Sequence, residues 1–311
     1  MIRIIGAGAS GLLAGALQPG SIIYEAREEN NKNNHEALFR FKDNKIGKYL
    51  GINFEKVRVN KAIWLDGKEV KPTPRITHLY SKKVSGKISD RSIFNIDPGI
   101  RYIPPDNFID ELRMRCHIEW GRKVDIQFLT ASIAINGDNV ISTIPMDKLL
   151  SILRINNDID FTYRSIWVNK YKLFGCDANC TIYYPDPKMS IYRASIVKST
   201  LILESIKPLV NQEELYTVCE SIGINSEELT IKEKVSNYEQ TLGKINKIES
   251  EKRKAIIKNF TINYGIYSLG RFATWRPKVM LDDVFEDILH IRRMIKDNGY
   301  SAIKHIQNDN N

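Results

Sequence analysis

The sequence has only four cysteines among 311 residues, which excludes the disulfide framework typical of small secreted proteins. It also has no apolar run near the ~18 residues that a membrane-spanning helix needs. The apolar N-terminal segment is interrupted by glycines and carries a single positive charge, which is not typical of a signal peptide. We therefore expect a cytoplasmic protein with no membrane partner.

Patterns for metal binding and nucleophilic catalysis are missing as well. Cys176 and Cys180 are spaced C-x3-C, but no second Cys/His pair lies nearby in the sequence. We interpret them as reduced thiols and predict no metal site. No Ser/His/Asp or Cys/His arrangement stands out, so in an enzyme of this sequence a cofactor would carry the chemistry.

Positive charge is in excess. The chain has 46 Lys and Arg against 37 Asp and Glu, a net charge of +9. This favours anionic partners, namely phosphorylated cofactors, an anionic or nucleotide-linked small-molecule substrate, or nucleic acid. Because the lysines are scattered along the chain, a solvated basic surface is an equally simple explanation.

The first 27 residues fit a dinucleotide-binding βαβ unit. We predict a strand over residues 2–5, a helix over 9–17 and a second strand over 21–27. Glycines follow the pattern G-x-G-x-x-G, which allows a tight turn, close approach of a pyrophosphate and close helix packing. The candidate cofactor-binding residues are Gly6, Gly8, Ala9, Ser10, Gly11, Glu25, Ala26 and Arg27.

Glu25 lies at the end of the second predicted strand, where a carboxylate can accept hydrogen bonds from a ribose hydroxyl. The N-terminal N–H groups of the predicted helix would face the phosphates. FAD and NAD share the adenosine ribose, so this unit leaves the choice between them open. A tight βα turn without a ligand is the alternative.

The remaining sequence alternates β-rich and helical regions without a repeat or linker, so we expect interleaved domains. Asp66-Gly67 is a typical turn for a hairpin within residues 61–74. The other predicted elements are a strand at 35–41, a helix within 103–116, three short strands within 123–145, strands within 161–203, mostly helix over 207–259, a strand at 264–270 and an amphipathic helix at 281–300.

Several segments resemble UDP-galactopyranose mutase and the wider flavoprotein group that includes the amine oxidases. The most specific is "YSLGRFATWRPKVMLDDVFEDIL", because these proteins place a Gly-Arg pair beside the flavin, after the last core strand. Gly270 and Arg271 match that pair. The other similar segments are "LFRFKDNKIGKYL", "AIWLDGKEVKPTP", "RYIPPDNFIDEL", "VISTIP" and "SIYRASIVKS".

The resemblance implies an α/β fold, with a Rossmann-like FAD-binding domain, an interleaved β-rich substrate domain and a helical segment. It implies FAD as the cofactor. The expected FAD-binding domain is discontinuous, over 1–45, 100–160 and 262–311. The expected substrate-binding region covers 46–99 and 161–261.

The sequence departs from this group in two places. "REENNKNNH" stands where these flavoproteins usually have a Gly-Gly pair, and "TWRPKV" stands where the mutases have paired tyrosines that contact the substrate diphosphate. The second departure counts against a standard mutase pocket.

Three side chains are candidates for contact with the substrate. Arg193 matches a mutase arginine that binds diphosphate, Arg40 lies between two phenylalanines, and Trp275 could form an aromatic wall. The alternatives are solvent-facing strand positions for both arginines and core packing for Trp275. Arg271 is expected at the flavin, or else in a surface ion pair, and His35 is a weaker candidate.

Taken together, the sequence predicts an FAD-dependent oxidoreductase. The expected reaction is hydride transfer to the flavin from a polar or anionic substrate, possibly one that bears an amine. One alternative is a sugar-nucleotide mutase that uses reduced FAD. The other is a flavoenzyme or binding protein that acts on nucleic acid or a modified base.

Overall fold

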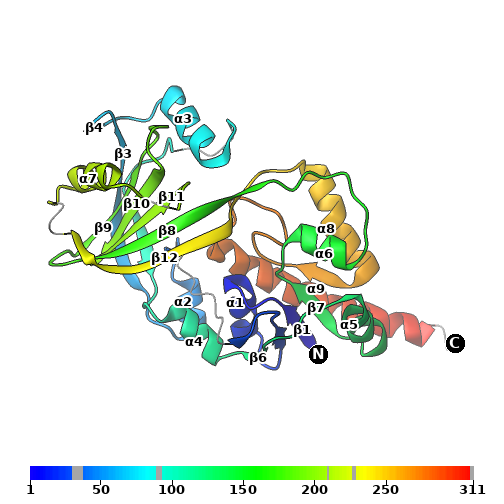
Figure 1. Ribbon diagram of the computed structural model, residues 1–311. Coiled ribbons are helices and arrows are strands. Elements are labelled where there is room, and N and C mark those ends of the chain that lie inside the picture. Colours follow the sequence, from blue (N-terminus) through cyan, green and yellow to red (C-terminus); the bar gives the residue numbers. More distant parts are fainter. Residues whose placement is uncertain (30–37, 89–92, 209, 226–228, 309–311) are drawn as a thin grey trace.

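The computed structural model describes residues 1–29, 38–88, 93–208, 210–225 and 229–308. It shows two lobes, each built on its own β-sheet (Figure 1). Among these residues, no helix combines the length and the apolar character needed to cross a membrane. The α/β class expected from the sequence is confirmed.

The first sheet is parallel and has the order β13-β7-β1-β2-β6. Counted along the chain this is 5-4-1-2-3, the strand order of doubly wound dinucleotide-binding folds. The strands are β1 (Ile2–Ile5), β2 (Ile22–Tyr24), β6 (His117–Glu119), β7 (Asn139–Ser142) and β13 (Ile266–Ser268). The order reverses between β1 and β7, and ligands of such sheets bind at this switch point.

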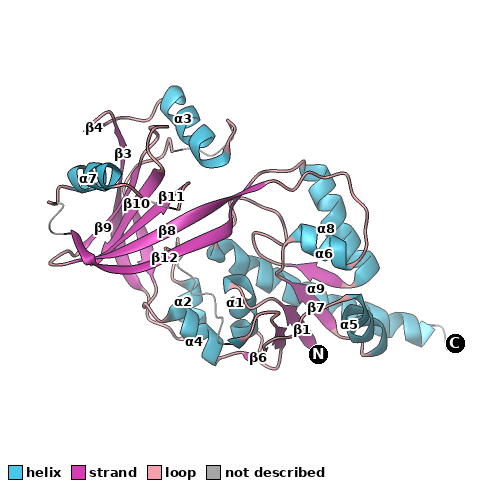
Figure 2. Cartoon of the chain, viewed as in Figure 1, coloured by secondary structure: helices cyan, strands magenta, loops and turns pink. Residues whose placement is uncertain are grey.

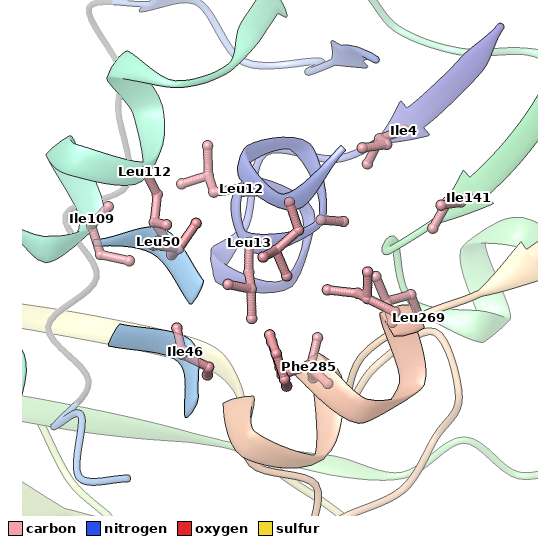
Figure 3. Close-up of a cluster of buried hydrophobic side chains, with 14 of the residues drawn as sticks. Ile4, Leu12, Leu13, Ile46, Leu50, Ile109, Leu112, Ile141, Leu269 and Phe285 are labelled. Carbon is pink, nitrogen blue, oxygen red and sulfur yellow. The ribbon is translucent and has the colours of Figure 1, made fainter. Parts of the chain in front are cut away.

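Helix α1 (Ala9–Leu17) lies at the centre of the lobe that contains the parallel sheet. Leu12 and Leu13 are 0% exposed in a cluster of apolar side chains from several elements (Figure 3). The cluster takes residues from α2 (Lys45–Leu50), α4 (Phe108–Met114) and α9 (Leu281–Asn308). This packing fixes the N-terminus of α1 at the end of β1.

The second sheet has the order β12-β8-β11-β10-β9-β3-β4, with β5 paired to β3. Its pairs are antiparallel except for β3 and β9, which run parallel. The strands are β3 (Glu55–Leu65), β4 (Lys68–Glu69), β5 (Gly99–Ile103), β8 (Tyr163–Leu173), β9 (Ala178–Tyr183), β10 (Ile191–Lys198), β11 (Thr200–Ser205) and β12 (Leu229–Ile245).

Helices pack on the second sheet through two separate apolar clusters. Helix α3 (Pro74–Ser85) contributes to one cluster and α7 (Gln212–Ile222) to the other (Figure 2). The hairpin predicted around Asp66-Gly67 is confirmed as β3 and β4. Both turn residues have left-handed backbone angles, with φ of 54° and 71°, as a two-residue hairpin loop requires.

Two of the three short strands predicted within 123–145 are wrong. The chain forms helix α5 (Ile126–Thr130) followed by the π-helical turn η2 (Ala131–Ile135). The Asp125 side chain accepts a hydrogen bond from the N–H of Phe128 and so caps α5. Short apolar runs fit either a strand or a buried helix, and here the cap favours the helix.

The helical prediction for 207–259 is wrong in its middle part, which forms the long strand β12 between α7 and α8 (Ser250–Tyr264). Pairing with β8 holds this charged segment at the edge of the sheet, and tertiary pairing overrides local propensity there. The strand predicted at 35–41 is also not formed over 38–40, since only Phe41 makes a β-bridge, to Tyr102. Residues 35–37 lie outside the described residues.

The division into two domains remains a proposal, but the packing favours a change in its boundaries. Side chains from 46–54 lie in the cluster around α1. Phe260 of α8 packs with Met146 of α6 (Met146–Ile152) and with Ile266 of β13. We would therefore place 46–54 and 250–261 with the dinucleotide-binding domain.

Candidate functional site

A cavity of about 400 Å³ lies between the glycine loop and the antiparallel sheet. It begins at the N-terminus of α1 and reaches β12. Its lining residues are Gly8, Ala9, Ser10, Leu38, Phe39, Arg40, Phe41, Thr143, Val168, Tyr238, Gln240, Thr241, Leu242, Arg271, Phe272, Val279, Met280, Leu281, Asp282 and Val284.

Each glycine of the N-terminal loop meets a different requirement. Gly6 has a φ of +96°, which L-residues rarely adopt. A Cβ on Gly11 would lie 1.9 Å from the carbonyl oxygen of Gly6, so helix and loop could not approach as they do. Around Gly8 a Cβ would meet no atom within 4 Å, and this open space lies at the cavity. The tight turn at Gly6 and the close packing at Gly11 match the pattern, while approach of a pyrophosphate at Gly8 stays a prediction.

The open space faces the start of α1. Gly8 occupies the N-cap position and supplies no side-chain hydrogen bond to the first turn. The N–H groups of a first helical turn carry partial positive charge and bind anions well. Ala9 and Ser10 line the cavity there, so the loop is suited to a pyrophosphate.

Gly270 brings the C-terminal segment into contact with this loop. A Cβ on Gly270 would lie 2.4 Å from the Ser10 hydroxyl oxygen, and its φ is +90°. Strand β13 pairs with β7 beside β1, which places the two segments at the same end of the sheet. The glycine loop and the Gly-Arg pair therefore lie next to each other, and both segments contribute residues to the lining of the cavity.

Arg271 lines the cavity from the segment that leads into α9. Its Nε and Nη2 atoms donate to the Val279 carbonyl oxygen at 3.2 and 3.1 Å. Its Nη2 also contacts the Met280 sulfur at 3.9 Å, and together these contacts orient the guanidinium beside the cavity.

Glu25 is buried, and four hydrogen bonds reach its carboxylate. One comes from the N–H of Ala7 at 2.7 Å, and the others come from the N–H, Nε and Nη2 of Arg27. Burial acts to raise the pKa of Glu25, but these bonds hold the pKa below its ordinary value. A carboxylate offers about four acceptor positions, and these four bonds occupy them. Ala26 is exposed.

Arg40 crosses from the cavity to the antiparallel sheet. It donates to the Thr181 hydroxyl at 2.6 Å and to the carbonyl oxygens of Cys180 and Ile196 at 3.1 and 2.7 Å. Burial, followed by the positive charge of Arg193, lowers the pKa of Arg40 to about 10. The guanidinium still carries its charge at neutral pH.

Arg193 does not line the cavity, although the strand register places it on the same sheet face as the cavity residue Val168. It makes an ion pair with Glu204. Burial opposes the charge of Arg193, but Glu204, together with Tyr192 and Tyr80, raises its pKa above the ordinary value. Its role as a substrate anchor remains a proposal that must account for this partner.

Trp275 is not brought to the cavity. Its side chain is 1% exposed, its ring packs edge-on against Phe161 with centroids 4.7 Å apart, and its Nε1 donates to the Asn246 carbonyl oxygen. The expected aromatic wall is therefore not formed by this residue, and core packing is its role. His35 lies outside the described residues.

Thr143 was missed as a site residue, although it lies within the segment "VISTIP". Its hydroxyl donates to the carbonyl oxygens of Ile5 and Gly6 at 2.8 and 3.1 Å, and so ties the ends of β1 and β7 together at the switch point. A hydroxyl residue directly after the fourth parallel strand was the available signal.

Other lining residues had no signal in the sequence. Tyr238, Gln240 and Thr241 belong to β12, where a helix was predicted. Asp282, in the first turn of α9, accepts from the N–H of Lys42 at 3.2 and 3.3 Å. Burial raises the pKa of this half-buried carboxyl.

No protein-family model and no curated protein matches the sequence. Solved structures do match its fold. The crystal structure of reduced UDP-galactopyranose mutase has a TM-score of 0.62 at 15% identity, covering 94% of this chain and 95% of that one. A CLA-producing fatty acid isomerase from P. acnes has a TM-score of 0.54 at 13% identity, covering 94% of this chain and 98% of that one.

An oxidoreductase from Methanosarcina mazei matches with a TM-score of 0.51 at 11% identity, covering 94% of this chain and 99% of that one. At these identities the likeness establishes the fold alone. The predicted resemblance to the mutase-like flavoprotein group is confirmed at that level, and the fold is one that enzymes use.

Proposed function

We propose that this chain is an FAD-dependent oxidoreductase in which hydride passes from a polar or anionic substrate to the flavin. The observation that carries the proposal is the contact between Gly270 and Ser10, a residue that lines the cavity. It joins the two segments that are specific to this flavoprotein group. The fold shared with the mutase, the isomerase and the oxidoreductase supports it.

The residues present fit FAD. The open space at Gly8 and the N-terminus of α1 would receive the pyrophosphate, and Glu25 would receive the adenosine ribose after releasing one bond from Arg27. The Gly270-Arg271 segment and Thr143 would border the ring system. When bound, FAD supplies an electron-accepting ring, which no side chain can supply.

The side chains of the cavity would bind and orient the substrate. Arg40 and Arg271 carry positive charge for an anionic group, and Gln240 and Thr241 offer hydrogen bonds from the opposite wall. The carboxylate of Asp282 also lines the cavity. It is suited to accept the proton that the substrate loses when its hydride passes to the flavin. Phe39, like its apolar neighbours, would exclude water.

The proposal is tested by adding candidate substrates anaerobically to the FAD-loaded protein. Primary and secondary amines that carry a carboxylate or phosphate group form the first panel. We expect at least one compound to bleach the visible flavin absorbance. If dithionite reduces the bound flavin but none of the compounds bleaches its absorbance, the result would count against an oxidoreductase.

Gly8→Val provides a matched control for this experiment. A Cβ at position 8 meets no atom within 4 Å, and the φ of −72° suits an L-residue, so the variant should fold. The added side chain would occupy the space assigned to the pyrophosphate. We expect Gly8→Val to keep its circular dichroism spectrum and lose flavin.

The likeness to UDP-galactopyranose mutase favours a second candidate, a sugar-nucleotide mutase that requires reduced flavin. Incubation with UDP-galactopyranose and dithionite, followed by chromatography, tests it. Formation of the furanose isomer would support the mutase, whereas an unchanged sugar nucleotide would exclude this substrate.

A further inference from the structure

We propose that Arg40, Lys61 and Arg101 together bind a phosphoryl group of the substrate beside the cavity. Arg40 would belong to both places, because it lines the cavity and its guanidinium extends to Thr181, beside the proposed phosphoryl site. The proposal rests on the function proposed above, since it assigns the reactive part of the same substrate to the cavity.

A β-bridge brings Arg40 close to Arg101. The N–H of Phe41 donates to the Tyr102 carbonyl oxygen at 2.9 Å, and the N–H of Tyr102 donates to the Phe41 carbonyl oxygen at 3.0 Å. The bridge is antiparallel, so Arg40 and Arg101 lie diagonally across it on one face, and the residue directly opposite Arg101 is Lys42, which pairs with Asp283. The segment 38–41 is thereby held against β5.

The side chain of Arg40 then extends toward Lys61. Its Nη1 donates to the Thr181 hydroxyl at 2.6 Å. Thr181 of β9 is the register partner of Lys61 on the neighbouring strand β3. Adjacent strands lie about 4.8 Å apart and paired residues share a face, so Lys61 and the Arg40 guanidinium flank Thr181 together.

The three cations have few negative neighbours. Within the described part of the chain, none of the three makes an ion pair with a carboxylate: the hydrogen bonds of Arg40 go to a hydroxyl and two carbonyl oxygens, and Arg101 donates to the Ile100 carbonyl oxygen. The exposed Asp97 is near enough to raise the pKa of Lys61. Arg193, the next cation on this face, already has Glu204.

Repulsion among the three cations also supports an anion-binding site here. Burial first, then the charges of Arg101 and Arg40, lower the pKa of Lys61. A bound anion would relieve this repulsion. Lys61 and Arg101 are both partly exposed, so an anion can reach them from solvent.

A phosphoryl group fits this arrangement better than a carboxylate does. It carries a charge of about −1.5 to −2 and three acceptor oxygens at neutral pH, whereas a carboxylate carries one charge. Two guanidinium groups and an ammonium can together saturate such a group. The geometry therefore favours a phosphorylated or diphosphate-linked substrate.

Binding of inorganic pyrophosphate to the purified, FAD-loaded protein tests the site, with calorimetry at constant ionic strength. Acetate is the second arm and distinguishes a carboxylate site. We expect pyrophosphate to bind more tightly than acetate, and Lys61→Ala or Arg101→Ala to weaken it by at least about 10-fold, as loss of a charge-assisted hydrogen bond implies. Lys68→Ala, in the exposed strand β4, is the matched control and should bind as the wild type does.

The flavin absorbance of each variant is recorded in the same samples. Wild-type pyrophosphate affinity in both variants, or equal affinity for acetate, would overturn the phosphoryl site. A protein that binds no FAD but retains a pyrophosphate affinity sensitive to Lys61 would instead contradict the proposed function and leave the anion site standing.

Discussion

At the scale of single residues, the contact between Gly270 and Ser10 joins the two parts of the site. A side chain at position 270 would force Ser10 or the backbone to shift, because a Cβ there would lie 2.4 Å from the Ser10 oxygen. The resemblance predicted that the Gly-Arg segment and the glycine loop belong to one cofactor site, but it did not predict this contact. The engagement of Glu25 by Arg27 could not be predicted, since it depends on side-chain geometry at the end of β2.

Gly270→Ala should weaken FAD binding by at least about 10-fold and destabilise the protein by roughly 1–3 kcal/mol, because it adds both backbone strain and a clash. Fluorescence titration with FAD and urea unfolding measure the two effects. Gly137→Ala is the matched control, since Gly137 also has a positive φ, of 64°, but open space around it. Equal FAD affinity in both variants would mean that the contact does not shape the site.

Lys83 is a buried amine whose charge is disfavoured. It donates to the carbonyl oxygens of Tyr184 and Ile191 at 2.7 and 2.6 Å, and the carboxylates of Asp186 and Glu214 lie near it. Burial lowers its pKa from 10.5 to about 7 in the folded protein. The unfolded chain therefore binds the additional proton between these two pH values.

This pKa shift predicts that the free energy of unfolding rises with pH between 7 and 9, by up to about 1.4 kcal/mol per pH unit from Lys83. Lys83→Met should remove this contribution to the slope, while Lys82→Met, its exposed neighbour, should keep it. Urea unfolding of each protein at pH 7 and at pH 9 measures the difference in slope. The same slope in Lys83→Met and the wild type would show that Lys83 does not titrate in this range.

At the scale of elements, the sequence predicted helices and strands that depend on residues close in sequence. It did not predict strands that depend on pairing with distant parts of the chain. The β1-α1-β2 unit, the hairpin at Asp66-Gly67 and helix α9 follow from periodicity, glycines and turn residues close in sequence. Strand β12 follows from its pairing with β8, far along the chain. Because β12 supplies one wall of the cavity, an error in one element hid three site residues.

Helix α1 should depend on its buried leucines more than on its local propensity. Leu12 is 0% exposed at the centre of the cluster in Figure 3. We expect Leu12→Ala to destabilise the protein by about 2–5 kcal/mol, because truncation leaves a cavity. Met114→Ala, at a side chain that is 73% exposed, should change stability by less than about 0.5 kcal/mol. Thermal unfolding compares the two, and similar shifts would contradict this packing.

At the scale of the whole molecule, the cavity lies between the two sheets, so neither lobe supplies the site alone. The parallel sheet contributes the glycine loop and the Gly-Arg segment, and the antiparallel sheet contributes β12 and the strands that hold Arg40. The resemblance predicted this arrangement in outline. The size of the cavity and the position of its cations required the three-dimensional packing.

The absorption spectrum of the purified protein, before and after incubation with FAD and gel filtration, tests the central claim most directly. Gly8, Ser10 and Arg271 line one cavity, and Gly270 contacts Ser10 at its edge, so we expect the visible bands of a bound flavin, at a ratio approaching one flavin per chain. A colourless protein that releases all added FAD on the column would contradict the account.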